Sequence, residues 1–124
     1  MSFHKASTFL ESAQYAINGI ILAFGSQKNL QRMCLISILV IIVSFIFQLS
    51  YLEGAVIAIC LTIAFFAEMI NTAIETIIDS SYGDEFSFVA KSVKDVAAGA
   101  VLIVSIGDVF VGLLIFLPKF LAMW

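Results

Sequence analysis

The chain has little charge, little proline and few side chains that bind metals. Only 12% of its 124 residues are charged, it contains one proline and one histidine, and 62% of its residues are hydrophobic. A soluble domain of this size could not bury so much apolar surface. The composition therefore excludes an ordinary soluble enzyme and predicts a protein whose solvent is lipid.

Cysteine and histidine offer little chemistry. Cys34 and Cys60 lie inside apolar runs, where we expect small buried hydrophobic side chains rather than a disulfide or a metal pair. His4 lies near the N-terminus, and we expect no chemical role for it. The first residues, MSFHKASTFLESAQ, are polar and of mixed charge, unlike a cleavable signal peptide. No GxxxxGK[ST] sequence or kinase-type glycine loop occurs, so any nucleotide site is not a P-loop.

Long hydrophobic runs are what the chain has instead. Three segments meet or approach the roughly 20 residues that a bilayer requires, at about 33–49, 54–78 and 96–116. The link 50–53 is short and predicts an antiparallel hairpin, whereas the link 80–89 is longer and polar. Because basic residues favour the cytoplasmic side, we expect the N-terminus and the second link to face the cytoplasm: Lys5, Lys28, Arg32, Lys91 and Lys94 lie there, and only Lys119 lies opposite.

An amphipathic pattern precedes the first span. Apolar residues recur at helical spacing over about 6–25, which predicts a helix lying in the cytoplasmic interface. Its polar face, which includes Glu11 and Tyr15, either faces water while the helix anchors the chain or closes over acidic residues of the second span. Gly25 and Ser26 would form the hinge into the first span. The predicted fold is an all-α membrane protein, a single domain over 1–124 with one interfacial helix and three transmembrane helices.

The second span carries acidic and amide residues at membrane depth. Glu68, Asn71, Glu75 and Asp79, here called the acidic stripe, recur at helical spacing in AEMINTAIETIID and share one face. Intramembrane carboxylates are rarely kept without a function, although interhelical hydrogen bonding is the alternative. We favour a site in which the deeper Glu68 is a general base and the shallower Glu75 binds a divalent metal.

A second cluster begins the third span, in AKSVKDVAAGAVLI. Lysine at a membrane surface can simply snorkel or contact anionic headgroups. Here the connection should return Lys91 and Lys94 to the vicinity of the acidic stripe. Cations beside metal-binding carboxylates suit a polyphosphate. The small residues that follow would let a helix backbone or a lipid chain approach closely.

With EMINTAIETIID and AKSVKDVAAGAVLI in this order, nearly the whole chain resembles the prokaryotic diacylglycerol kinase family, which includes undecaprenol kinases. The ending GLLIFLPKF is more similar to the undecaprenol kinase branch. The resemblance implies a homotrimer in the bacterial inner membrane with composite active sites facing the cytoplasm. Each site would transfer the γ-phosphate of ATP, with Mg²⁺, to the hydroxyl of diacylglycerol or undecaprenol. We expect no nucleic-acid partner.

The resemblance also implies roles for individual residues. Glu68 would be the catalytic base that contacts the lipid alcohol, with Asn71 as the amide that supports it. Glu75 would bind Mg²⁺ and bridge the nucleotide phosphates, and Ala98 would contact the lipid. The remaining implied nucleotide contacts are Lys94, Asp95, Tyr15, Glu85 and Phe86.

The chain departs from the family pattern before the first span. Gln27 stands where the family has a second acidic metal ligand, and Gln31 stands where it has an arginine. Arg32, one position further on, could compensate. Some relatives carry an arginine near the position of Thr8. A glutamine carbonyl can ligate Mg²⁺ but lacks charge, so metal affinity should fall, and Glu11 is a possible substitute acid.

Asp108 does not fit the same site. It lies 13 residues past Asp95, about 20 Å along a helix. It is either a functional intramembrane acid or, as we expect, a protonated side chain bonded to Ser105, Thr62 or another subunit.

Two other functions stay open. A small proton-coupled multidrug exporter would have four spans and an isolated membrane-embedded acid. A catalytically reduced family member could bind lipid or assist assembly, and the exchange of the family acid for Gln27 supports that alternative.

Overall fold

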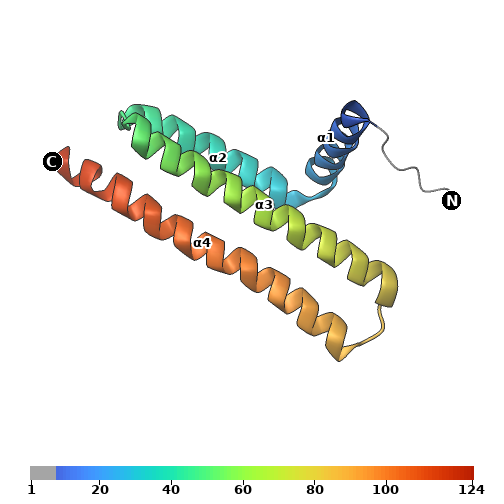
Figure 1. Ribbon diagram of the computed structural model, residues 1–124. Helices are drawn as coiled ribbons and strands as arrows, with labels where there is room; N and C mark the ends of the chain where they lie inside the picture. The colour runs from blue at the N-terminus through green and yellow to red at the C-terminus, as the bar shows by residue number, and fades with distance from the viewer. Residues whose placement is uncertain (1–7) are drawn as a thin grey trace.

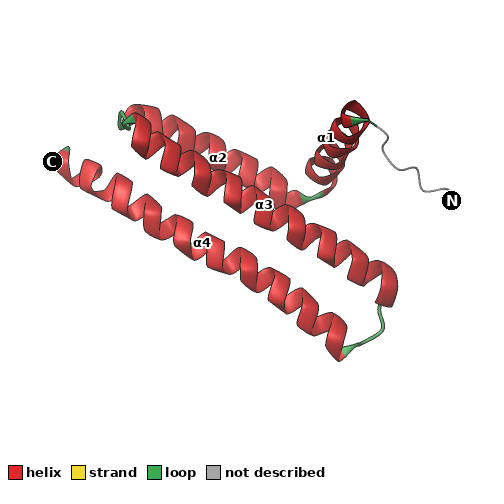
Figure 2. Cartoon of the chain, in the orientation of Figure 1, coloured by secondary structure: helices red, strands yellow, loops and turns green. Residues whose placement is uncertain are grey.

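The computed structural model describes residues 8–124, so His4 and Lys5, with the predictions made for them, lie outside the described residues. Figure 1 shows the helices α1 (Phe9–Ser26), α2 (Lys28–Ile46), α3 (Tyr51–Tyr82) and α4 (Phe88–Ala122). Only short loops separate them in Figure 2, and residues 8–124 contain no strand. α2, α3 and α4 are each long and apolar enough to cross a membrane. The predicted all-α class with three helices of membrane-spanning length is confirmed.

The first hairpin turns three residues earlier than expected, at 47–50 rather than 50–53. A capping box starts α3: the Ser50 hydroxyl accepts from the Glu53 N–H at 3.2 Å, and the Glu53 carboxylate accepts from the Ser50 N–H at 3.0 Å. These bonds satisfy backbone donors that a helix N-terminus otherwise leaves free. Gln48 takes the positive φ of 53° that the tight turn requires.

The second link is shorter than predicted, at 83–87 rather than 80–89. Gly83 ends α3 with a φ of 58°, and its N–H donates to the Asp79 carbonyl at 3.0 Å. A residue with a side chain would be strained at this φ. Ser87 then caps α4 by accepting from the Ala90 N–H at 3.3 Å. The helices therefore extend beyond the apolar segments at this end, and the link holds them close together.

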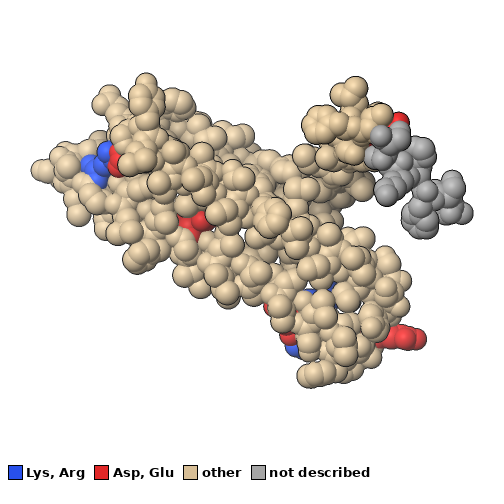
Figure 3. All heavy atoms as spheres, viewed as in Figure 1, with Lys and Arg blue, Asp and Glu red and all other residues tan. Residues whose placement is uncertain are grey.

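α3 and α4 run antiparallel, and α2 lies along the first part of α3 (Figure 1). Two ion pairs join α3 to α4 near their opposite ends: Lys119 Nζ lies 3.1 Å from Glu53 Oε1, and Lys94 Nζ lies 2.8 Å from Asp79 Oδ1. On the face shown in Figure 3, charged atoms accordingly gather mainly near the two ends of a largely uncharged surface. The two pairs lie where α3, which carries the acidic stripe, meets α4, which carries Lys94.

The hinge between α1 and α2 lies at Gln27, so the prediction of a hinge at Gly25 and Ser26 is wrong. Gln27 is extended, with φ −106° and ψ 114°. Both predicted hinge residues are helical, because the backbone ladder of α1 continues through them and the Ser26 hydroxyl donates to the Leu22 carbonyl at 2.7 Å. α1 has no buried residue and projects from the bundle in Figure 1. Within one chain, its polar face does not cover the acidic stripe.

A single chain buries very little. Among the residues that the structure describes, the buried apolar side chains are those of Leu30, Ile57, Ala90 and Ala97. Large apolar side chains are exposed along all four helices. Lipid or neighbouring chains must therefore cover most of this surface.

Candidate active site

Two polar side chains of the acidic stripe are buried. Glu68 is 6% exposed and Asn71 is 7% exposed, and no other polar or charged residue between 8 and 124 is buried. Glu68 Oε1 accepts a hydrogen bond from Asn29 Nδ2 of α2 at 3.3 Å. Asn71 Nδ2 donates to Glu75 Oε1 at 3.2 Å, one turn along α3. The stripe is thus a set of bonded groups, the arrangement that a buried carboxylate requires.

Cations from two helices lie near the stripe. Lys94 of α4 donates to Asp79 at 2.8 Å, which confirms that the second link returns this lysine to the stripe. Arg32 Nη1 lies 3.5 Å from Asn29 Oδ1 and so approaches the other part of the stripe. Gln31, in the position of the family arginine, instead donates to the Phe24 carbonyl of α1 at 3.0 Å. Arg32 is thus the cation that contacts Asn29, the hydrogen-bond partner of Glu68.

A polar hollow of about 270 Å³ lies where α3 and α4 meet the second link. Four residues expected to contact a nucleotide line it together with Asp79 and Lys91: Glu85, Phe86, Lys94 and Asp95. Lys91 and Asp95 form an exposed ion pair at 2.6 Å. The hollow therefore presents two ammonium groups beside several carboxylates, a charge pattern suited to a polyphosphate with a divalent cation.

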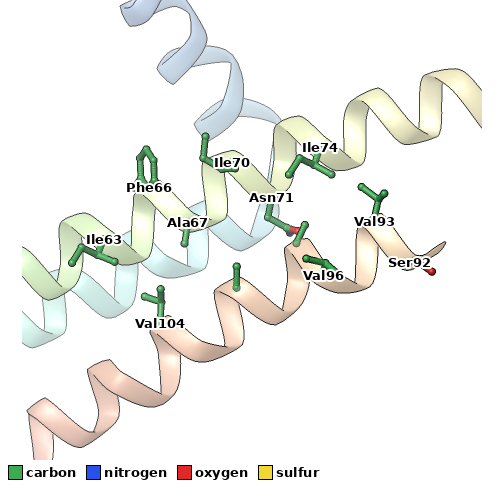
Figure 4. A pocket seen from close by; sticks show the side chains of 12 residues that line it. Ile63, Phe66, Ala67, Ile70, Asn71, Ile74, Ser92, Val93, Val96 and Val104 are labelled. Atoms are coloured by element: carbon green, nitrogen blue, oxygen red, sulfur yellow. The ribbon is translucent and has the colours of Figure 1, made fainter. Parts of the chain in front are cut away.

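An apolar groove of about 640 Å³ runs between α3 and α4 (Figure 4). Asn71 lines it and points from α3 toward Val96 of α4. Its Oδ1 is buried and accepts no hydrogen bond from the described part of the chain. Ala97 lines the groove as well, whereas Ala98, expected to contact lipid, is exposed and does not. The groove thus presents one unsatisfied acceptor within a wall of aliphatic side chains.

Other expected site residues are not gathered in one chain. Tyr15 on α1 is 47% exposed and does not line the polar hollow, and Glu75 does not line it either. Gln27 occupies the hinge and makes no side-chain cap bond to α2. Thr8 caps α1 by accepting from the Glu11 N–H at 3.1 Å. Within residues 8–124, no three His, Cys, Asp or Glu side chains lie close enough together to hold a metal ion.

Two of the three partners expected for Asp108, Ser105 and Thr62, bond elsewhere. The hydroxyls of Ser105 and Thr62 donate to carbonyls of their own helices, Val101 and Ala58, both at 2.8 Å. Short hydroxyl side chains in helices commonly bond in this way. Asp108 instead lines one cavity together with Cys60 of α3.

The cysteines are both free, as expected, but neither is buried. Each is half-buried in the chain, and Cys60 lies beside a polar residue, Asp108, rather than only among apolar side chains. Cys60 and Asp108 line a second cavity of about 470 Å³ between α2, α3 and α4. No sequence pattern signals this arrangement, because it depends on how two helices pack.

Comparison with known proteins agrees with this geometry. Residues 14–116 match the family described as prokaryotic diacylglycerol kinase. The chain is 34% identical over 122 residues to a diacylglycerol kinase of Synechocystis sp. (strain PCC 6803), an alignment covering 98% of this chain and 70% of that protein. It is also 34% identical over 116 residues to an undecaprenol kinase of Bacillus subtilis (strain 168), covering 94% of each chain. The family match includes the acidic stripe, Lys94 and Asp95.

The unsatisfied Asn71 oxygen leads to a prediction about stability. Asn71→Leu removes the unsatisfied Oδ1, which is favourable, but it also leaves the half-buried Glu75 carboxylate without the donor that Asn71 Nδ2 provides. Because these two effects oppose each other, we expect the melting temperature in detergent to change little, while activity is lost. Leu30→Ala is the reference, because truncating this fully buried side chain should cost about 2–5 kcal/mol. If Asn71→Leu destabilised the protein as much as Leu30→Ala, Asn71 would be a structural residue.

Proposed function

Because the chain belongs to the prokaryotic diacylglycerol kinase family, we propose that it phosphorylates its lipid at the acidic stripe, where the polar hollow approaches the apolar groove. The protein is a membrane lipid kinase that uses ATP and acts on diacylglycerol or undecaprenol. One observation carries the proposed location: Asn71 lines the groove, and the buried Glu68, which lines neither cavity and is bonded to Asn29 of α2, lies one turn away on the same helix. A lipid in the groove and a nucleotide in the hollow would meet along this helix.

In the proposed reaction, the apolar chain of the lipid occupies the groove, and its hydroxyl first donates a hydrogen bond to the free Oδ1 of Asn71. For the transfer, the hydroxyl rotates so that the same proton is donated to Glu68 instead. The hydroxyl oxygen then attacks the γ-phosphorus of ATP, and the bond between that phosphorus and the β–γ bridging oxygen breaks. Glu68, one helical turn from Asn71, accepts the hydroxyl proton as general base. The products are the phosphorylated lipid and ADP. Positioning and charge neutralisation supply most of the acceleration in such transfers.

We propose that Lys94 and Lys91 bind the nucleotide phosphates. Both are already bonded to carboxylates in the hollow, to Asp79 and Asp95 respectively. An incoming polyphosphate would exchange with these exposed partners, a step that has a small energetic cost because exposed ion pairs are weak. The lysines would then neutralise charge on the transferring group.

We propose Mg²⁺ as the metal. The oxygen donors that suit it are the Glu75 carboxylate, half-buried and held by Asn71, and the amide oxygen of Gln27. When bound, Mg²⁺ would neutralise charge on the nucleotide phosphates. Because one chain does not assemble three acidic ligands in its described residues, the nucleotide itself and further residues would complete the coordination.

A homotrimer with composite sites explains why α1 lies apart from the hollow. Tyr15 does not line the polar hollow of its own chain. α1 of a neighbouring chain would bring a Tyr15 side chain there, and the extensive exposed apolar surface would be covered in the same assembly. The three apolar helices and the family fit a bacterial inner membrane. We propose that the active site faces the cytoplasm. Basic residues favour the cytoplasmic side of a membrane, and the start of α2 and the start of α4 carry Lys28, Arg32, Lys91 and Lys94.

The alternative functions receive less support. An exporter would have four spans and an isolated acid, whereas residues 8–124 contain three helices long enough to span and a hydrogen-bonded acidic stripe. A catalytically reduced family member remains an alternative, because Gln27 stands where the family has an acidic metal ligand. The following two experiments separate it from an active kinase.

The first test is phosphoryl transfer from labelled ATP to diacylglycerol and to undecaprenol in mixed micelles. Wild type should phosphorylate at least one of these lipids in the presence of Mg²⁺. Glu68→Gln, which keeps the size and the acceptor for Asn29 but removes the base, should lower kcat by roughly 10²-fold or more. No transfer by wild type would support the reduced member, and full activity of Glu68→Gln would refute the role of Glu68.

The second test concerns the metal. Gln27→Glu should lower the Mg²⁺ concentration needed for half-maximal activity, because a carboxylate adds charge to the ligand set. The control is Gln48→Glu, which adds the same charge in the turn between α2 and α3 and should leave the Mg²⁺ dependence unchanged. An unchanged Mg²⁺ dependence in Gln27→Glu would remove Gln27 from the metal site.

A further inference from the structure

A side chain of α2 reaches the buried carboxylate of α3. Asn29 Nδ2 donates to Glu68 Oε1 at 3.3 Å, across 39 positions of sequence. Glu68 is only 6% exposed, so water has little access to its carboxylate in this chain. A hydrogen bond to a buried charged group is worth more than one at the surface. The contact is therefore a strong constraint on where the Glu68 carboxylate points.

The orientation of the Asn29 amide follows from its two neighbours. Arg32 Nη1 lies 3.5 Å from Asn29 Oδ1, on the side opposite the bond to Glu68. A guanidinium can only donate hydrogen bonds, and an ionised carboxylate can only accept them. Of the two orientations of an amide placed between them, the favourable one has its oxygen toward Arg32 and its NH₂ group toward Glu68. The reversed amide would put an acceptor against the carboxylate and a donor against the cation.

The backbone around Asn29 is held on both sides. Leu30, the next residue, is fully buried at 0% exposure. Gln31 donates to the Phe24 carbonyl at 3.0 Å, which ties the start of α2 back to α1 across the Gln27 hinge. A polar group presented by an anchored turn loses little further freedom when it engages the carboxylate.

We propose that Asn29 is a positioning residue for the general base, kept in its orientation by Arg32. This inference rests on the proposed role of Glu68. With Oε1 engaged by the amide, Oε2 is the oxygen that receives the proton of the lipid hydroxyl. The amide neither takes up nor releases a proton at neutral pH, so it orients the base without competing for the proton.

The test compares three variants for kcat and for the KM of ATP. Asn29→Asp has the size of Asn29 but replaces the donor with a charged acceptor facing Glu68, and Asn29→Ala removes the group. We expect kcat to fall roughly 10- to 100-fold in Asn29→Ala and further in Asn29→Asp, with the KM of ATP within about twofold of wild type. Arg32→Gln, which leaves Asn29 in place, should show a smaller loss of kcat. Ser44→Ala is the control on α2, since its hydroxyl only donates to the Val40 carbonyl of the same helix.

A chemical readout separates positioning from simple loss of structure. An acceptor lipid with fluorine next to the hydroxyl-bearing carbon releases its proton more readily and depends less on a well-placed base. The kcat deficit of Asn29→Ala should therefore shrink with this acceptor, which a merely misfolded enzyme would not show. The inference is overturned if Asn29→Asp keeps the wild-type kcat, if kcat is unchanged while the KM of ATP rises, or if the fluorinated acceptor leaves the deficit the same.

The outcomes also distinguish this inference from the proposed function. If Glu68→Gln is inactive while Asn29→Asp matches wild type, Glu68 is still the base and only the role of Asn29 fails. If Glu68→Gln is fully active, the proposed role of Glu68 fails and this inference fails with it. If Asn29→Asp does not fold, Arg32→Gln and Asn29→Ala still decide the matter, because neither places a second carboxylate against Glu68.

Discussion

The need to satisfy buried polar groups within a largely apolar helical bundle is the constraint on which this structure depends. Glu68 and Asn71 are the buried polar side chains of residues 8–124, and leaving such groups without partners is strongly unfavourable. Asn29 donates a hydrogen bond to Glu68, and Asn71 donates one to Glu75. The remaining unsatisfied acceptor, Oδ1 of Asn71, lies at the apolar groove, where a lipid hydroxyl could satisfy it. In this account the unsatisfied group marks the place of the substrate.

One chain does not assemble the whole site. Ion pairs lie near both ends of α3 and α4, the helices that form the groove and the hollow. The hinge at Gln27 carries α1 away from the bundle, so the side chains of α1 do not line the hollow of their own chain. A chain with so small an apolar core is suited to function as part of an assembly in lipid.

Features set by helical periodicity were predictable from the sequence, and features set by packing between helices were not. The acidic stripe follows from residue spacing on α3, and the approach of Lys94 follows from a short link between two long helices. The Asn29–Glu68 contact and the cavity shared by Cys60 and Asp108 depend on which faces of separate helices meet, which one sequence does not reveal. The prediction of a turn at 50–53 is wrong, although Ser50 and Glu53 form a recognisable capping-box pattern that starts α3 at Tyr51. The hinge lies at Gln27 rather than at Gly25 and Ser26, because backbone hydrogen bonding keeps these two residues helical.

The central claim is that the lipid hydroxyl is brought to Asn71 and Glu68 through the groove between α3 and α4. The most direct measurement is photolabelling with an acceptor lipid that carries a diazirine next to its hydroxyl, followed by mapping of the labelled peptides. The account predicts label on the groove-lining parts of α3 and α4, around 66–74 and 93–100, and loss of label when unmodified acceptor is added in excess. Label confined to the second cavity, around 105–112 of α4, would contradict it.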